Sequence, residues 1–165
     1  MSRTEESLRE AFAGESQASR KYLAFASTAD SEGYPQVARM FRAAAEAETI
    51  HAHNHLRALH GIGNTRENLT EAIAGETHEF TKMYPDMVAG AKAEGDKEAE
   101  RSFYYANQVE KTHARLYQGL LDRLGEGQET YPYFVCPVCG HTAERAAPDR
   151  CPVCGAPGSM FSRVE

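Results

Sequence analysis

The helical part of this chain contains one sequence pattern twice, the second copy displaced by 62 residues from the first. Three pairs of identical residues mark the repeat: Phe41 with Phe103, Glu48 with Glu110, and His51 with His113. Shorter matches lie at about the same displacement, Ala13–Ser16 with Ala74–Thr77 and Glu32–Gly33 with Glu94–Gly95. A repeat of this length describes one supersecondary unit that is present twice. The fold must therefore pack two copies of the same unit.

Each copy is predicted to be a pair of helices, because its apolar residues recur at helical spacing. The first helix starts at a capping box, Ser2 to Glu5, and ends in the turn 30–35. Pro35 opens the second helix, which runs to about His60 and stops at 61–63. The third begins at Asn64 or Thr65 and ends near Gly95, and the fourth runs from Asp96 to the glycines at 125–127. Pro85 predicts a kink in the third helix. Four such helices predict an all-α four-helix bundle.

A Glu-x-x-His motif occurs in each copy, as Glu48 with His51 and as Glu110 with His113. Residues three apart share a helix face, so each motif places a carboxylate beside an imidazole. With 19 glutamates and seven histidines in 165 residues, about one such motif is expected by chance. The matching positions are the stronger signal. The first helix of each copy also carries an Ala-Gly-Glu, which supplies Glu15 and Glu76.

Folding the two copies together predicts a two-metal site. One Glu from each of two helices and Glu-x-x-His from each of the other two is the known ligand set of ferritin-like di-iron proteins. The alternative is that these side chains are solvated surface residues. Small or apolar neighbours on the same stripe argue against this: Phe41, Ala44, Ala45, Ala47 and Ala106. Carboxylates facing inward without a cation would be very costly, which favours metal binding.

The second copy offers one more carboxylate than the first. Glu79 lies one turn beyond Glu76, where the first copy has Ala18. We expect Glu79 to be a further ligand, the alternative being an exposed glutamate. Tyr22 and Tyr84 lie about two turns past Glu15 and Glu76. They are predicted either to hydrogen-bond ligand carboxylates or to be plain core aromatics. The remaining histidines are not predicted as ligands.

The last part of the chain differs in character and is predicted to be a small separate domain. Residues 131–135 are aromatic and β-prone, and two Cys-Pro-Val-Cys-Gly segments follow. They supply Cys136, Cys139, Cys151 and Cys154. Four thiolates predict a tetrahedral all-sulfur site that suits zinc or iron. The neighbouring redox-type site favours iron here, with zinc as the alternative in recombinant protein.

Charge and hydropathy exclude several other functions. The net charge of −6 and the scattered acidic residues argue against nucleic-acid binding, which needs a basic patch. No apolar run approaches the roughly 18 residues of a membrane span, and the polar N-terminus does not resemble a secretory signal. Paired cysteines without a signal favour metal ligation over disulfides. The expected location is the cytoplasm.

These motifs together resemble the rubrerythrin family over nearly the whole chain. The matching segments are Ala13–Glu15, Glu48–His51, Gly75–Glu79 leading to Met83–Pro85, Glu110–His113 and the two Cys-Pro-Val-Cys-Gly segments. The resemblance implies a ferritin-like di-iron four-helix bundle over residues 1–127. It implies a rubredoxin-like four-cysteine iron domain with β structure over residues 131–165.

The resemblance also implies a function, the reduction of hydrogen peroxide to water as a defence against oxidative stress. Electrons are expected from reduced rubredoxin or an NAD(P)H-dependent reductase, through the four-cysteine iron. By the same resemblance Glu79 and His51 alternate as ligands of one iron when the site changes oxidation state.

Two other functions use the same residues. A ferroxidase or iron-storage protein of ferritin type would use the same bundle, but storage requires neither Glu79 nor the cysteine domain. A structural zinc protein that binds a partner would leave the internal carboxylates without a purpose. Peroxide reduction is therefore the favoured interpretation.

The link between the second and third helices is short. In a ferritin-like bundle these helices run parallel, so the link must return along the bundle. Residues 61–65 reach at most about 17 Å, whereas about 30 Å separates the ligand-bearing turns at 1.5 Å per residue. We therefore expect a homodimer in which the first two helices of one chain complete a site with the last two of another. Fraying of both helix ends is the alternative.

Overall fold

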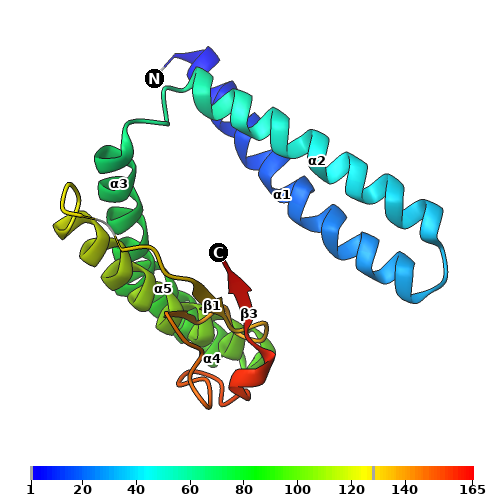
Figure 1. Cartoon of the computed structure of the whole chain (residues 1–165). Coiled ribbons are helices and arrows are strands. Elements are labelled where there is room, and N and C mark those ends of the chain that lie inside the picture. Colours follow the sequence, from blue (N-terminus) through cyan, green and yellow to red (C-terminus); the bar gives the residue numbers. More distant parts are fainter. Residues whose placement is uncertain (1, 128) are drawn as a thin grey trace. The chain divides into compact units, whose positions relative to one another are not determined.

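The computed structural model describes residues 2–127 and 129–165. The described residues divide between Gly63 and Asn64 into two compact units. Figure 1 shows that the first unit consists of helices α1 and α2 and that the second holds the remaining helices and the small sheet. Within the described residues, no helix is long and apolar enough to cross a membrane.

The first unit is an antiparallel helical hairpin, α1 (Arg3–Ser31) and α2 (Pro35–Ala58). The Ser2 side chain caps α1 by accepting a hydrogen bond from the Glu5 backbone. The reciprocal half of the predicted capping box does not form, because the Glu5 carboxylate pairs with Arg9 instead. Pro35 occupies the first turn of α2, as predicted. The helix ends at Ala58, two residues before the expected end.

Small residues line the contact between α1 and α2. Ala38, Ala45 and Ala52 are buried at intervals of seven residues on α2. On α1 the buried residues are Ser19, Ala26 and Ala29, and the Ser19 hydroxyl hydrogen-bonds that of Thr49 at 2.9 Å. Small side chains at heptad spacing let two helices approach closely along a straight seam. The hairpin is therefore held by alanine packing rather than by large core residues.

The large apolar residues of this hairpin lie mostly outside that seam. Phe25, Met40 and Ile50 remain 47%, 66% and 53% exposed. Exposed apolar area of this kind marks a surface that packs against another element. The hairpin thus carries a second apolar face that its own two helices do not bury.

The second unit begins with a helix that is interrupted midway by a π-helical turn. Asn64 caps α3 (Thr65–His78) with a complete capping box to Glu67. A π-helical turn, η1 (Glu79–Met83), follows and leads into α4 (Tyr84–Glu94). Gly95 then reverses the chain in the left-handed conformation (φ 75°). Asp96 caps α5 (Lys97–Asp122), which packs against α3 and α4.

Where the sequence predicts a kink at Pro85, the structure has this π-helical turn directly before the proline. Proline has no N–H, and its ring clashes with the carbonyl four residues earlier, so regular α-helix cannot pass through it. The chain widens in the preceding turn, where the Tyr84 N–H donates to the Glu79 carbonyl five residues back. Single π turns of this kind are frequent at functional sites. The turn begins at Glu79, the extra carboxylate of the second copy.

A small antiparallel sheet completes the second unit. Its order is β2 (Thr142–Glu144), β1 (Tyr133–Val135), β3 (Ser162–Val164). A short 3₁₀ turn, η2 (Gly158–Met160), precedes β3. In the central strand, Val135 pairs with Thr142 on one side and Ser162 on the other. The strand predicted around residues 131–135 is thus the centre of the sheet, and it leads directly into Cys136.

Candidate metal centres

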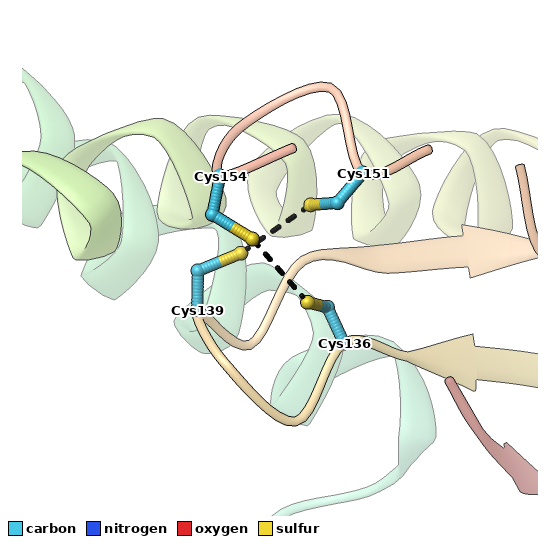
Figure 2. Close-up of side chains that lie close together, drawn as sticks. All are labelled: Cys136, Cys139, Cys151 and Cys154. Atoms are coloured by element: carbon cyan, nitrogen blue, oxygen red, sulfur yellow. Dashed lines mark hydrogen bonds between the residues drawn. The ribbon is translucent and has the colours of Figure 1, made fainter. Parts of the chain in front are cut away.

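The four cysteines lie together in the second unit. Figure 2 shows their sulfur atoms pointing toward one another from two loops. The Sγ atoms of Cys136 and Cys154 are 3.6 Å apart, and those of Cys139 and Cys151 are 3.5 Å apart. A tetrahedral site with metal–sulfur bonds of about 2.3 Å places its sulfurs about 3.8 Å apart. The geometry therefore fits one tetrahedral metal ion.

The two loops are shaped by the glycine after each cysteine pair. Gly140 and Gly155 have φ values of 83° and 77°, in the left-handed region that glycine adopts without strain. Their N–H groups bond back to the carbonyls of Cys136 and Cys151. The tight turns bring other backbone N–H groups to the sulfurs, such as those of Val153 and Cys154 to Cys151.

Hydrogen bonds from these N–H groups affect the pKa values of the thiols. Burial by itself raises the pKa of Cys151, but hydrogen bonds from the backbone of Cys154 and Val153 and from neighbouring thiols bring it down to about 7. Burial raises the pKa of Cys139 despite a backbone hydrogen bond from His141. Metal binding needs all four thiolates, and a bound cation would supply the remaining stabilisation.

The first hairpin brings together Glu15, Glu48 and His51, here called the first half-site. Their ligand atoms all lie within 4.8 Å of one another. His51 Nδ1 lies 2.8 Å from a Glu48 oxygen, as the i, i+3 spacing predicts. The His51 side chain remains 53% exposed. The first half-site is thus assembled by one hairpin and is open on its imidazole side within that unit.

The second unit brings together Glu76, Glu110 and His113, here called the second half-site. His113 Nδ1 lies 2.8 Å from a Glu110 oxygen and 3.7 Å from a Glu76 oxygen. The side chains are more enclosed than in the first half-site, with 27%, 19% and 16% exposure for His113, Glu76 and Glu110. The two halves of the sequence repeat therefore form matching clusters, one in each unit.

Crowding of carboxylates perturbs the second half-site. Burial, the Glu110 charge and a hydrogen bond between the two carboxyl groups raise the pKa of Glu76 to about 7. The hydrogen bond to Glu110 raises the pKa of His113 against the opposing effect of burial. A carboxyl group whose charge is this disfavoured binds a proton, or a cation in its place. The chemistry of the donor set fits a divalent or trivalent metal ion.

Glu79 lies near the second half-site without belonging to its cluster of ligand atoms. Burial and the charge of Glu110 raise its pKa. Burial and the charges of Glu110, Glu79 and Glu76 raise the pKa of Tyr84, so its hydroxyl also lies close to these carboxylates. The Tyr22 ring packs against Phe25 and Phe41 at centroid distances of 6.3 and 6.0 Å. Within the described residues neither tyrosine hydroxyl hydrogen-bonds a ligand carboxylate, so their roles stay predictions.

Comparison with known proteins agrees with these two kinds of site. The sequence model described as Rubrerythrin matches residues 6–121, and the one described as Rubrerythrin, rubredoxin-like domain matches residues 134–162. The chain belongs to the rubrerythrin family. Rubrerythrin-2 of Clostridium acetobutylicum is 37% identical over 96% of this chain and 95% of its own length. Rubrerythrin of Porphyromonas gingivalis is 39% identical over 99% of this chain and 91% of its own length.

Solved structures of a related rubrerythrin-family protein support the fold. A structure of nigerythrin in a partially reduced state matches with a TM-score of 0.60 and 30% identity. The match covers 99% of this chain and 88% of that chain. The predicted fold class, an all-α ferritin-like protein with a small rubredoxin-like β domain, is confirmed. The chain carries carboxylate/histidine candidates for a di-iron centre and a rubredoxin-like four-cysteine site, as predicted.

One residue beside the second half-site was not predicted. Thr142 Oγ1 lies 2.9 Å from His113 Nε2. Thr142 stands 29 positions away in the sequence, beyond the end of the repeat, and no motif marks it. The sequence contains no signal that would have found it, because the contact depends on how β2 lies against α5.

The carboxylate crowding predicts a pH dependence for the metal-free protein. Glu76 holds its proton more tightly when folded (pKa about 7) than when unfolded (ordinary value 4.5), so its contribution to stability falls as pH rises through this window. Glu76→Gln should therefore gain stability relative to the wild type between these two pH values. Urea unfolding of chelator-treated protein at several pH values measures the difference.

The control for this experiment is Glu71→Gln, which removes an exposed carboxylate from the same helix. Its stability difference from the wild type should stay flat across the same pH range. A flat difference for Glu76→Gln as well would contradict the account of the second half-site.

Proposed function

We propose that this protein is a non-haem di-iron peroxidase that reduces hydrogen peroxide to water and so defends the cell against oxidative stress. The observation that carries the proposal is that carboxylate/histidine half-sites and a four-thiol cluster occur in one chain. Glu79 adds a carboxylate that iron storage does not need. Ferroxidase activity of ferritin type is the alternative that the experiment below separates.

The proposed di-iron ligands come from both halves of the repeat. They are Glu15, Glu48, His51, Glu76, Glu79, Glu110 and His113. When bound, two irons supply together the two electrons that reduction of one peroxide consumes, with two protons taken up to give two waters. The carboxylates offset the iron charge, and each histidine offers the Nδ1 atom that faces its neighbouring glutamate. Tyr22 and Tyr84 are proposed as hydrogen-bond donors to these carboxylates.

The four thiolates of Cys136, Cys139, Cys151 and Cys154 are proposed to hold a one-electron iron centre. A tetrahedral sulfur site suits iron as well as zinc, and all four cysteines are free thiols. Electrons would come from reduced rubredoxin or an NAD(P)H-dependent reductase. Free thiol ligands are also the reason to propose a cytoplasmic location. We further propose a division into domains 1–127 and 131–165, supported by the two family matches.

The length of the link between α2 and α3 supports a homodimer with exchanged hairpins. His51 lies seven residues before the end of α2, about 10 Å, and Glu76 lies eleven residues after the start of α3, about 16 Å. If the helices run parallel in one bundle, the link must return about 26 Å. Residues 59–64 reach at most about 22 Å when fully extended. They must also cross the interaxial distance, about 8–10 Å or more.

The conformation of the link shortens it further. His60 has a positive φ of 53°, and Gly61 N–H bonds back to the Leu56 carbonyl. This is the Schellman arrangement that ends a helix, so the first residues of the link curl back rather than extend. The apolar face of the first hairpin must still be covered. In the proposed dimer, the second hairpin of a partner chain covers it and completes the metal site.

The proposed activity predicts a rapid reaction of the reduced protein with hydrogen peroxide. Iron-loaded protein is reduced without oxygen and mixed rapidly with hydrogen peroxide, while the visible absorbance of the sulfur-bound iron is followed. We expect rapid reoxidation, two electrons consumed per peroxide, and a slower return with oxygen. Glu79→Gln should slow the reaction about tenfold or more, whereas Glu71→Gln should not change it. A sulfur-bound iron that ignores peroxide while oxygen oxidises the protein would favour the ferroxidase.

The second prediction concerns the exchanged hairpins. Glu48→Ala damages the first hairpin and Glu110→Ala the second, so each variant alone should lack an intact site. In an exchanged dimer of one chain of each kind, the two undamaged hairpins meet at one of the two sites. Co-expression should therefore restore about a quarter of the wild-type di-iron content and peroxidase activity, since half the dimers are mixed.

The matched control is co-expression of Glu48→Ala with His51→Ala, which both damage the first hairpin. That pair restores nothing in any arrangement. Failure of the Glu48→Ala and Glu110→Ala pair to exceed this control would show that each chain builds its own site.

A further inference from the structure

The four-cysteine domain contacts the second half-site through the Thr142 side chain. Strand β2 lies against α5, and Thr142 Oγ1 is 2.9 Å from His113 Nε2. The same oxygen is 3.2 Å from the carbonyl oxygen of Gly140. Gly140 follows Cys139 directly, and a Cβ built on it would meet Val109 of α5 at 3.8 Å. The first cysteine loop is thus seated on the helix that carries His113.

The two nitrogens of His113 face different partners. Nδ1 faces the carboxylates of Glu110 and Glu76, at 2.8 and 3.7 Å. Nε2 faces Thr142. A histidine that binds a metal through one nitrogen must carry its proton on the other. Binding through Nδ1 therefore requires Nε2–H, and Thr142 Oγ1 is the acceptor placed to receive it.

A threonine hydroxyl can accept one hydrogen bond and donate another at once. Nε2–H of His113 donates to Thr142 Oγ1, and the Thr142 hydroxyl donates to the Gly140 carbonyl. When a metal replaces the proton on Nδ1, this direction of bonds leaves the Nδ1 lone pair free for an ion that the carboxylates also bind. We infer that Thr142 is a positioning residue, through which the four-cysteine domain fixes the ring orientation and the metal-binding tautomer of His113.

The first half-site lacks this support. His51 has the same contact to Glu48 as His113 has to Glu110, at 2.8 Å in both. Among the described residues of the first hairpin, nothing hydrogen-bonds His51 Nε2, and the ring is half exposed. The two histidines are equivalent by sequence repeat but differ in what holds them. The second half-site is therefore the preorganised one.

Metal binding at the cysteine site constrains the position of Thr142 through the sheet. Thr142 is three residues after Cys139, and it pairs with Val135, which directly precedes Cys136. A metal held by these two cysteines fixes both strand ends that position Thr142. Binding at the four-cysteine site and at the second half-site should therefore favour each other, since coupling between two sites is reciprocal.

The inference rests on the proposed di-metal site but not on peroxide reduction, so the test is metal binding. The protein is prepared with iron in the cysteine site and the other sites emptied by chelation, and then titrated with Co²⁺ without oxygen. Thr142→Val keeps the shape and removes the hydroxyl. We expect it to weaken Co²⁺ binding at the second half-site about tenfold. Thr142→Ser keeps the hydroxyl and should bind as the wild type does.

Ser162→Ala is the matched control. Ser162 pairs with Val135 on the opposite side of the central strand, and among the described residues its hydroxyl bonds the Val135 carbonyl alone. Its removal should leave Co²⁺ affinity unchanged. Equal affinity for Thr142→Val and the wild type would overturn the inference. A wild type that binds no Co²⁺ outside the cysteine site would instead overturn the proposed di-metal site.

A second measurement needs no variant. In the zinc-loaded wild type, nitrogen NMR of His113 should show a proton on Nε2 that exchanges slowly with solvent, and a metal-bound Nδ1. A proton on Nδ1, or an Nε2 proton that exchanges as fast as that of an exposed histidine such as His53, would contradict the assigned role of Thr142.

Discussion

Carboxylates held close together repel one another, and this repulsion is the main constraint on the second half-site. In the second half-site, burial and the charge of Glu110 push the pKa of Glu76 to about 7. A helical protein gains nothing from such crowding unless a cation replaces the proton. The remaining features, the repeat, the alanine seam and the π turn, all act to place these carboxylates. The repulsion that raises the pKa of Glu76 in the metal-free protein is therefore relieved when a cation binds.

The hairpin is the unit that delivers these ligands, and it is incomplete by itself. Alanines at heptad spacing bring α1 and α2 close, which aligns Glu15 with Glu48 and His51. The same packing leaves Phe25 and Met40 largely exposed. In the proposed dimer a second hairpin covers that face, and the short link after α2 is the reason to propose that it comes from a partner chain. Metal ligation and burial of this face therefore call for the same assembly step.

Periodic patterns predicted most of the fold, and ligand spacing named the residues that the structure groups into two half-sites and a cysteine cluster. Helix starts at Ser2, Pro35 and Asp96 follow from local chemistry, and Glu-x-x-His fixes which side chains meet on one helix. The predictions were less accurate where backbone geometry adapts. The end of α2 depends on a Schellman turn at His60, a non-glycine residue in the left-handed region. Pro85 indicated an irregularity but not that it would widen the helix from Glu79 onward.

The sequence did not predict how the small sheet packs against the helices. Thr142 meets His113 because β2 docks on α5, and neither repeat nor motif records that docking. The difference in environment between His51 and His113 also arises from this packing of β2 on α5. His51 and His113 occupy equivalent repeat positions, yet His113 has a neighbour from the sheet within its own unit, whereas no described residue of the first hairpin hydrogen-bonds His51 Nε2. A symmetric sequence pattern thus gives two half-sites of unequal preorganisation.

The central claim is that two half-sites, one from each hairpin of the repeat, form one two-metal centre. A crystal structure of the iron-loaded protein, with anomalous scattering measured at the iron edge, tests it most directly. We predict two irons about 3.5–4 Å apart, bound by Glu48 and His51 on one side and by Glu110 and His113 on the other. A third iron should lie among the four cysteines. Iron found only at the cysteines, or single ions held separately by each hairpin, would contradict the account.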